Sequence, residues 1–299
     1  MHVDEAVHAI KFGYLLENNY YRYNPVEYHG PTLNYFSLIP AWILGEKNIS
    51  EVTEATLRIV PVLAGLLLLC LIFLLKDIGK DFVLVTLIFT GFSSLIVFYN
   101  RYYIQESLLV SFSFSGMIAY YSFRKTNKVC WLITSAVLFG LTFTSKETSI
   151  ITFFGIALSV FILKMMNKTV RFKFSINRKN VFLFILTFAI TAILFFASFF
   201  TNLHGALDSV LTFTNYFGKA ENNAEHIHPF YYYFSLVSFR TIDEVFFSEL
   251  LILFFFIFGL IRVFSKANKN SNGMDFIKFI SIFTIIVTFI YSAIPYKTP

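Results

Sequence analysis

Long apolar runs separated by short polar segments fill most of the chain after residue 55. Each run is close to the ~20 residues that an α-helix needs to cross a bilayer. The predicted spans are 56–75, 82–99, 107–123, 129–145, 148–164, 181–200, 245–262 and 276–294. Short polar connections, such as 76–81 and 123–128, predict antiparallel neighbours. The pattern therefore predicts an all-α polytopic membrane protein, a bundle of about eight transmembrane helices.

The first 55 residues are mixed polar and aromatic, and they are too charged to span a membrane. Apolar side chains recur there at helical spacing at Val3, Val7, Ile10 and Tyr14. This spacing predicts an amphipathic helix over 4–17 that lies at the membrane interface. Residues 18–24 are rich in Tyr and Asn and predict a loop, whereas 32–44 is apolar enough for a second helix that dips into the bilayer. A second long loop is predicted over 201–244.

Composition supports the membrane assignment. Charged residues make up 14% of the chain, against about 25% in soluble proteins. The 40 Phe residues exceed what a surface in water can accommodate, so lipid must cover much of the outside. The net charge of +6 does not indicate nucleic acid, because basic residues in membrane proteins record topology. Cys70 and Cys130 lie in or beside apolar runs and predict two buried thiols, neither a disulfide framework nor a metal site.

Charge along the chain predicts the topology. When the spans alternate, one side receives 15 of the 24 basic residues and three of the 18 acidic ones. The positive-inside rule makes this side cytoplasmic. All six histidines, the first 55 residues, the 100–106 and 145–147 turns and the 201–244 loop then fall outside. The polar chemistry is therefore expected on the extracytoplasmic face of the plasma membrane.

Two adjacent carboxylates open the chain, Asp4 and Glu5, with His8 one helical turn after Asp4. A partly desolvated carboxylate at a membrane boundary can act as a general base. The alternative is structural: Asp4 as the N-cap of the helix and Glu5 as a first-turn acid that complements the helix dipole. Spacing alone leaves both interpretations open.

Further candidates lie in the loops on the same predicted side. Tyr28 and His29 belong to a loop dense in Tyr, Pro and Gly, which could hold a sugar or form an aromatic belt at the membrane interface. Charges at the outer ends of spans fall at Arg101, Glu106, Lys146 and Glu147. Such charges tend to face a polar cavity, where a cation can hold a phosphate, although a single long side chain can also snorkel to water.

Three more polar residues have weaker signals. His226 and His228 have a spacing that would allow them to ligate a metal, but the sequence offers no third ligand nearby. Lys297 follows the last span and is open to the same two interpretations as the other cations at span ends.

Several motifs together resemble a known family. They are Asp-Glu-Ala-Val-His-Ala at 4–9, Tyr-x-Tyr-Asn-Pro-x-x-Tyr-His-Gly-Pro at 21–31, Arg58-x-x-Pro61, Asn-Arg-Tyr-Tyr at 100–103, Ser-Lys-Glu-Thr at 145–148 and Tyr-Lys-Thr-Pro at 296–299. The set resembles the flippase-activity-associated membrane proteins of prokaryotes. That family is similar in turn to the dolichyl-phosphate-mannose–protein mannosyltransferases and the aminoarabinose transferases of lipid A, which share the GT-C fold.

The resemblance implies a single GT-C-like domain over 1–299, with an outer loop at 1–55 that carries the acidic motif and transmembrane helices at 56–299. The catalytic carboxylates matching the family pattern are Asp4 and Glu5, and Asp4 is the expected base. Substrate or phosphate would be bound by His8, Tyr28, His29, Arg58, Arg101, Glu106, Lys146, Glu147 and Lys297. The family pattern has an acid where this chain has Asn24, so no role is carried over to that position. The family also has further spans on both sides, so the chain is expected to be a fragment, incomplete at both ends.

The implied reaction is an inverting transfer of a sugar from a polyprenyl- or dolichyl-phosphate to a glycan, lipid or protein acceptor. A divalent cation, Mg²⁺ or Mn²⁺, could bridge the phosphate and Asp4 or Glu5. Besides Asp4, the candidate metal ligands are His226 and His228. The competing hypothesis is a non-catalytic flippase, or an accessory of one, that uses the same cavity without a base. An ion-coupled transporter would need ionisable residues in mid-span and broken helices in paired halves, and the sequence shows neither.

Overall fold

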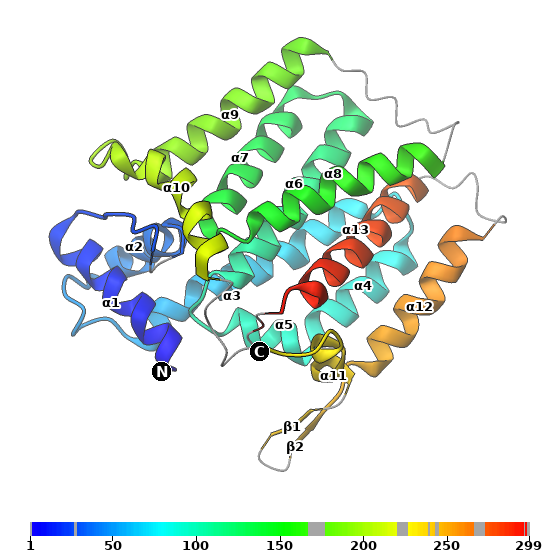
Figure 1. Cartoon of the computed structure of the whole chain (residues 1–299), viewed down its shortest axis with the longest axis horizontal. Helices are drawn as coiled ribbons and strands as arrows, with labels where there is room; N and C mark the ends of the chain where they lie inside the picture. The colour runs from blue at the N-terminus through cyan, green and yellow to red at the C-terminus, as the bar shows by residue number, and fades with distance from the viewer. Residues whose placement is uncertain are drawn as a thin grey trace. The chain divides into compact units, whose positions relative to one another are not determined.

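A computed structural model describes residues 2–26, 29–166, 177–219, 227–238, 240–242, 245–265, 273–295 and 297. The described residues form helices joined by loops, with one short β-hairpin (Figure 1). The chain divides into two compact units. Met1–Leu74, Leu95–Ser149 and Ile176–Tyr216 make up the first; Leu75–Ser94, Ile150–Ser175 and Phe217–Pro299 make up the second. The single domain over 1–299 stays a prediction.

The first unit contains α1 (Val3–Asn18), α2 (Thr32–Leu44), α3 (Glu54–Ile72), α6 (Glu106–Thr126), α7 (Val129–Ser145) and α9 (Arg178–Phe196), and most of α5 (Ser94–Asn100) and of α10 (His204–Lys219). A 3₁₀ turn, η1 (Phe73–Leu75), continues α3. Helix α6 packs against α7 and α3, and α7 packs against α9. A Cβ on Gly140 of α7 would lie 2.7 Å from Thr191 of α9, so the small residue permits the close approach of these two helices.

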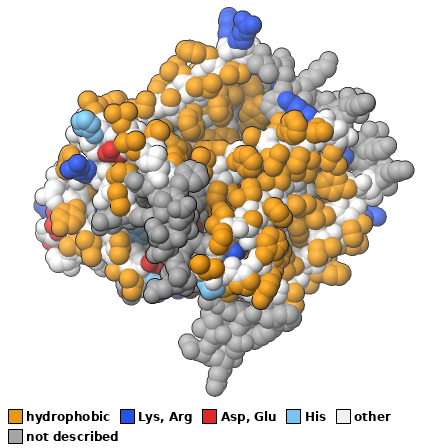
Figure 2. All heavy atoms as spheres, in the orientation of Figure 1, with side chains coloured by type: hydrophobic (Ala, Val, Ile, Leu, Met, Phe, Trp, Pro, Cys, Tyr) orange, Lys and Arg blue, Asp and Glu red, His pale blue; other side chains and the backbone are white. Residues whose placement is uncertain are grey.

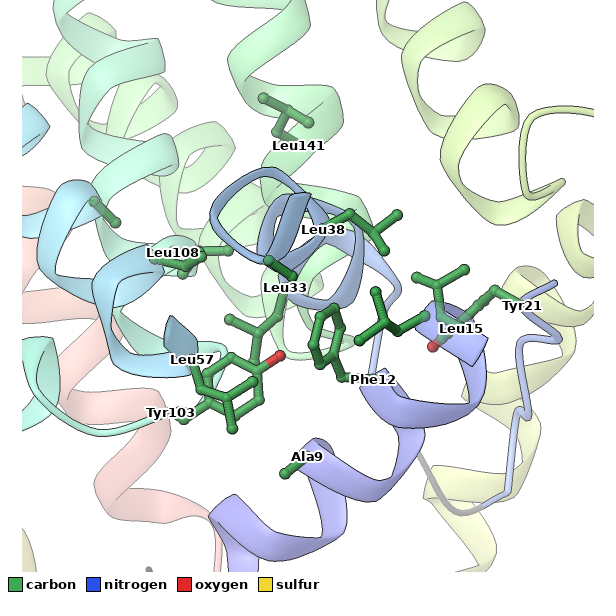
Figure 3. Packing of buried hydrophobic residues seen from close by; sticks show 14 of the residues in the cluster. Ala9, Phe12, Leu15, Tyr21, Leu33, Leu38, Leu57, Tyr103, Leu108 and Leu141 are labelled. Atoms are coloured by element: carbon green, nitrogen blue, oxygen red, sulfur yellow. The ribbon is translucent and has the colours of Figure 1, made fainter. Parts of the chain in front are cut away.

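The predicted helices before the first span are confirmed. The helix expected over 4–17 is α1, and the one expected over 32–44 is α2. Helix α1 begins with a capping box, in which the Glu5 carboxylate accepts the His2 N–H at 3.1 Å. The N-cap is therefore His2, and the alternative that placed Asp4 there is wrong. Helices α1, α2, α3, α6 and α7 share one apolar core, where Phe12, Leu33 and Tyr103 lie together (Figure 3).

The second unit contains α4 (Lys80–Phe92), α8 (Ser149–Met166, apart from its first residue), α11 (Tyr232–Ser238), α12 (Leu250–Phe264) and α13 (Met274–Ala293). Strands β1 (Arg240–Ile242) and β2 (Val245–Phe247) form the antiparallel hairpin, with Arg240 opposite Phe247. Helix α12 packs against α13, and Phe89 of α4 lies 5.4 Å from Phe255 of α12 between ring centroids. Gly155 of α8 lies against Phe283 and Val287 of α13.

The prediction of a helical membrane protein is confirmed, and each predicted span contains a helix, but fewer than the predicted eight meet the length and hydropathy needed for a span among the described residues. Four are long and apolar enough to cross a bilayer: α3 with η1, α8, α9 and α13. The bent pair α4 and α5 would add a fifth, and α2, α7 and α12 are shorter apolar helices. Apolar side chains cover much of the visible face in Figure 2. Phe182 of α9 and Phe254 of α12 are among the exposed large apolar residues, at 68% and 63%. The chain is an all-α polytopic membrane protein apart from the hairpin.

Two predicted element limits are corrected. The span at 82–99 is broken at Ser93, whose backbone is extended; Ser93 and Ser94 donate from their hydroxyls to Glu249, at 3.0 and 2.8 Å. The span at 245–262 begins with β2, so its helix starts only at Leu250.

The 201–244 segment also differs from a simple loop, because α10, α11 and β1 lie in it. Helix α10 is strongly amphipathic, and its polar residues hid it from a search for uniformly apolar runs.

Candidate functional site

A buried ion pair joins α1 to the start of α3. The Glu5 side chain is 1% exposed and accepts two hydrogen bonds from the Arg58 guanidinium: Nε to Oε1 at 2.8 Å and Nη2 to Oε2 at 2.7 Å. The Tyr103 N–H also donates to Oε1, at 2.9 Å. Arg58 reaches Glu54 with its remaining nitrogen, at 2.8 Å. Four hydrogen bonds, counting the one from His2, thus hold a single carboxylate.

These bonds determine the ionisation of Glu5. Burial raises the pKa of its carboxyl, but the hydrogen bonds from Arg58, Tyr103 and His2 outweigh burial and lower that pKa from 4.5 to about 2. Glu5 is therefore a carboxylate that is fully engaged in holding α1 against α3 and the Tyr103 turn.

Asp4 has a very different environment, although it is adjacent in sequence. Its side chain is 67% exposed, and Oδ2 lies 3.5 Å from His2 Nδ1. The same His2 nitrogen contacts the Tyr102 hydroxyl. Burial, followed by the charges of Asp4 and Glu5, raises the pKa of Tyr102 to about 12, so this phenol stays protonated beside Asp4. Asp4 is the carboxylate of the pair that solvent and a substrate can reach.

A second carboxylate, Glu147, holds a histidine. His29 Nδ1 lies 2.8 Å from Glu147 Oε2, and the Tyr23 hydroxyl donates to Oε1 at 3.1 Å. Tyr23 is 1% exposed and Glu147 6%, whereas the His29 side chain is 29% exposed. Burial raises the pKa of Glu147, but the hydrogen bond from His29 and its charge outweigh burial and lower that pKa. The imidazole is the accessible end of a buried polar chain.

The backbone next to His29 is fixed against the end of α7. A Cβ on Gly30 would lie 1.9 Å from the Thr144 carbonyl oxygen, so only glycine permits this approach. The hydroxyls of Thr32 and Thr144 are hydrogen-bonded at 2.7 Å. The loop that carries His29 is thereby held on the residues that precede Lys146 and Glu147.

Between these two carboxylate sites lies His8, which is 8% exposed. Its ring centroid is 5.9 Å from that of His29, and its Nδ1 lies 3.3 Å from the Gln105 amide nitrogen. Burial and the charge of His29 lower the pKa of His8 to about 4, so its ring is neutral near pH 7. Lys146 and Glu106 form an ion pair beside it, and both of their charges act on His8.

These groups lie at one end of the helices of the first unit. Glu106 begins α6 and Lys146 follows α7, and the two helices are packed together. The opposite end of this packed group carries basic residues: Arg124, Lys125, Lys128, Arg178 and Lys179. Seven of the predicted site residues meet at the first end: Glu5, His8, His29, Arg58, Glu106, Lys146 and Glu147.

The other predicted residues do not join this cluster within the described structure. Arg101 is exposed. Lys297 is 1% exposed in the second unit, where its ammonium donates to the carbonyls of His228, at 2.9 Å, and Ile294, at 2.7 Å. Tyr28 and His226 lie outside the described residues.

A metal site remains a prediction. Among the described residues no group of three or more His, Cys, Asp or Glu side chains is placed to hold an ion. Glu5 already accepts four hydrogen bonds, so Asp4 offers the accessible carboxylate oxygens at this point. A donor set of this size fits a divalent cation poorly, because Mg²⁺ and Mn²⁺ prefer several oxygen ligands.

Two groups of this site were not predicted from the sequence: the Gln105 side chain, which is 1% exposed and contacts His8, and the backbone N–H of Tyr103. Gln105 stands beside Glu106 in sequence, which is a usable signal for a polar turn. A backbone donor leaves no signal in residue type.

The fold and this cluster define a class, a multi-span helical membrane protein with ionised side chains gathered at one end of its helices. The sequence profile of the family described as dolichyl-phosphate-mannose-protein mannosyltransferase matches residues 37–197, just over half of the chain. The chain belongs to this family and is a membrane glycosyltransferase of the GT-C type. No curated protein and no solved structure matches it. The matched range includes Arg58, Glu106, Lys146 and Glu147, whereas Asp4, Glu5, His8 and His29 precede it.

Proposed function

We propose that this protein transfers a sugar from a polyprenyl- or dolichyl-phosphate to an acceptor hydroxyl of a glycan, lipid or protein on the extracytoplasmic face, with inversion at the anomeric carbon. The observation that carries the proposal is the cluster of paired charges at one end of the helices in a chain of the mannosyltransferase family. Its His29 ring and the neighbouring Asp4 side chain are accessible. Ionised groups of this kind at a helix end suit a charged lipid headgroup and a proton transfer.

Asp4 is the proposed base. Its exposed carboxylate would take the proton from the acceptor hydroxyl as that oxygen attacks the anomeric carbon. Glu5 would act as a positioning residue: its four hydrogen bonds fix the first turn of α1 and therefore fix where Asp4 lies. Asp4 rather than Glu5 is assigned as the base because Glu5 is buried and fully hydrogen-bonded, and a carboxyl group with a pKa of about 2 is a weak base.

The departing lipid phosphate needs positive charge nearby. Arg58 would act as a fixed cation held by Glu5 and Glu54, and Lys146 would act as one held by Glu106. Arg101 remains a proposed phosphate contact. No step in this mechanism is assigned to a metal.

A transfer assay with a charge-neutral substitution tests the proposal. The protein in lipid vesicles would receive radiolabelled polyprenyl-phosphate mannose together with membrane-derived acceptors. We expect Asp4→Asn to lower the rate by roughly 10²–10⁴-fold while leaving the affinity for the lipid nearly unchanged. Asp208→Asn on α10 is the matched control, because this carboxylate lies outside the cluster, and it should retain the wild-type rate.

Two results would count against the proposal. Full transfer by Asp4→Asn would remove Asp4 as the base. Binding of the lipid without any transfer by the wild-type protein would favour the non-catalytic lipid-handling function.

A further inference from the structure

We infer that His29, oriented by Glu147, donates a proton to the lipid phosphate as it leaves, so that the site uses a general acid as well as a base. The inference rests on the proposed function, since it assigns a role within the same reaction. The observation that carries it is the chain Tyr23–Glu147–His29, which runs from a buried phenol to an accessible imidazole.

The Glu147 carboxylate determines which nitrogen of His29 faces outward. Because Nδ1 is hydrogen-bonded to Oε2, Nε2 is the nitrogen that points away from the buried chain. Within the described residues Nε2 makes no hydrogen bond. A carboxylate on Nδ1 also balances the positive charge of a protonated ring, as in other enzymes where an acidic side chain orients a histidine.

His29 is placed rigidly enough for this role. Gly30 lies against the Thr144 backbone, and the Tyr23 ring packs on Phe196 of α9 with 4.9 Å between centroids. A proton donor works best when its position is fixed before the substrate arrives. The residues that hold the His29 loop, Gly30 and Tyr23, contact other parts of the chain than Nε2.

The cations of the cluster differ from His29 in what they already bind. Arg58 binds two carboxylates and Lys146 binds Glu106, so their charges are partly neutralised. His29 binds a carboxylate through one nitrogen and presents a second nitrogen, which a phosphate oxygen can approach. Lys146 directly precedes Glu147, so its charge is available to the same phosphate.

The proton balance closes with the two assigned groups. The bond between the anomeric carbon and the phosphate oxygen breaks, and its electron pair stays on that oxygen. The Nε2 proton of His29 moves to the phosphate, while the acceptor hydroxyl loses its proton to Asp4. The products are the glycosylated acceptor and a protonated lipid phosphate, and a proton returns from Asp4 to His29 through solvent.

The charged and titratable groups around His29 are Glu147, His8 and the Glu106–Lys146 ion pair. His8 comes from α1, Glu106 from the start of α6 and Glu147 from the turn after α7. His8 is neutral near pH 7, since its pKa lies at about 4. A protonated His29 therefore has no second positively charged imidazole beside it.

The test is the pH profile of kcat for four proteins: wild type, His29→Gln, Glu147→Gln and His204→Gln. His204 begins α10, is exposed and lies outside the cluster, so its variant is the matched control. We expect a fall in wild-type kcat at high pH, because the acid must be protonated. His29→Gln should lower kcat by roughly 10²-fold or more and abolish this fall, while KM for the lipid changes by less than about threefold. Glu147→Gln should lower kcat less than His29→Gln does, because the ring remains but loses the carboxylate that orients it.

Other results would overturn the inference. If His29→Gln raises KM and leaves kcat unchanged, the ring only binds the phosphate. If it lowers kcat but the fall at high pH persists, the ring has a structural role. If the wild type transfers sugar and His29→Gln has the same kcat, His29 is not the general acid but the proposed function stands. If the wild type transfers no sugar, the proposed function itself is rejected.

Discussion

Replacing Glu5 by Gln tests the structural core of the site most sharply. The substitution keeps the size of the side chain but removes the charge that Arg58 binds through two nitrogens. It also turns an amide NH₂ toward the guanidinium, so one acceptor is lost. We expect α1 to detach from α3 more readily.

The magnitude follows from the ionisation of Glu5. A carboxyl pKa lowered from 4.5 to about 2 corresponds to about 3 kcal/mol of stability near pH 7. The carboxylate is buried but the Arg58 side chain is 34% exposed, so solvent screening makes this figure an upper value. Because the folded pKa lies below the ordinary value, this stability is present above about pH 4.5 and is lost as the pH falls from there toward 2.

Hydrogen exchange of the α1 backbone measures this effect locally. A loss of about 3 kcal/mol should speed exchange through opening of α1 by roughly 10²-fold at pH 7. The matched control is Glu54→Gln, which removes the other carboxylate of Arg58. Its side chain is 48% exposed, so the cost should be only ~0–1 kcal/mol. Equal exchange in wild type and Glu5→Gln would refute the argument that this pair holds α1.

Two further substitutions test the loop of the first unit and the end of α13. Gly30→Ala places a Cβ against the Thr144 carbonyl oxygen and should displace His29. We expect this displacement to lower kcat by roughly 10²-fold. The control is Gly91→Ala, which has open space around the new Cβ and should keep the wild-type rate. Lys297→Met leaves the His228 and Ile294 carbonyls without their ammonium donor, which should cost ~1–3 kcal/mol and speed hydrogen exchange at 227–238. Unchanged exchange together with weaker lipid binding would instead make Lys297 a phosphate contact.

The sequence predicted those parts of the fold that depend on local pattern. Helix α2 begins and ends where its apolar run does, and α1 follows the spacing of Val3, Val7, Ile10 and Tyr14. The break at Ser93 was missed because the apolar run continues through it, and its hydroxyl partner Glu249 lies more than 150 residues further along the chain. Helix α10 was missed because one of its faces is polar.

The site was predictable by residue type but not by pairing. Position along the chain indicated Glu5, His29 and Glu147, and the family resemblance added Arg58. Their partners depend on how the helices pack, since 53 residues separate Glu5 from Arg58 and 118 separate His29 from Glu147. Asp4 and Glu5 are adjacent acidic residues that the sequence does not distinguish. They differ in side-chain exposure, because Asp4 lies on the exposed side of α1 and Glu5 on the buried side.

The most direct test of the central claim follows the fate of the lipid. The wild-type protein in vesicles would receive polyprenyl-phosphate mannose labelled in both the sugar and the lipid. Transfer predicts that sugar label appears on the acceptor and that free polyprenyl phosphate appears in equal amount. Movement of the intact labelled lipid across the bilayer, with the sugar still attached, would contradict the account.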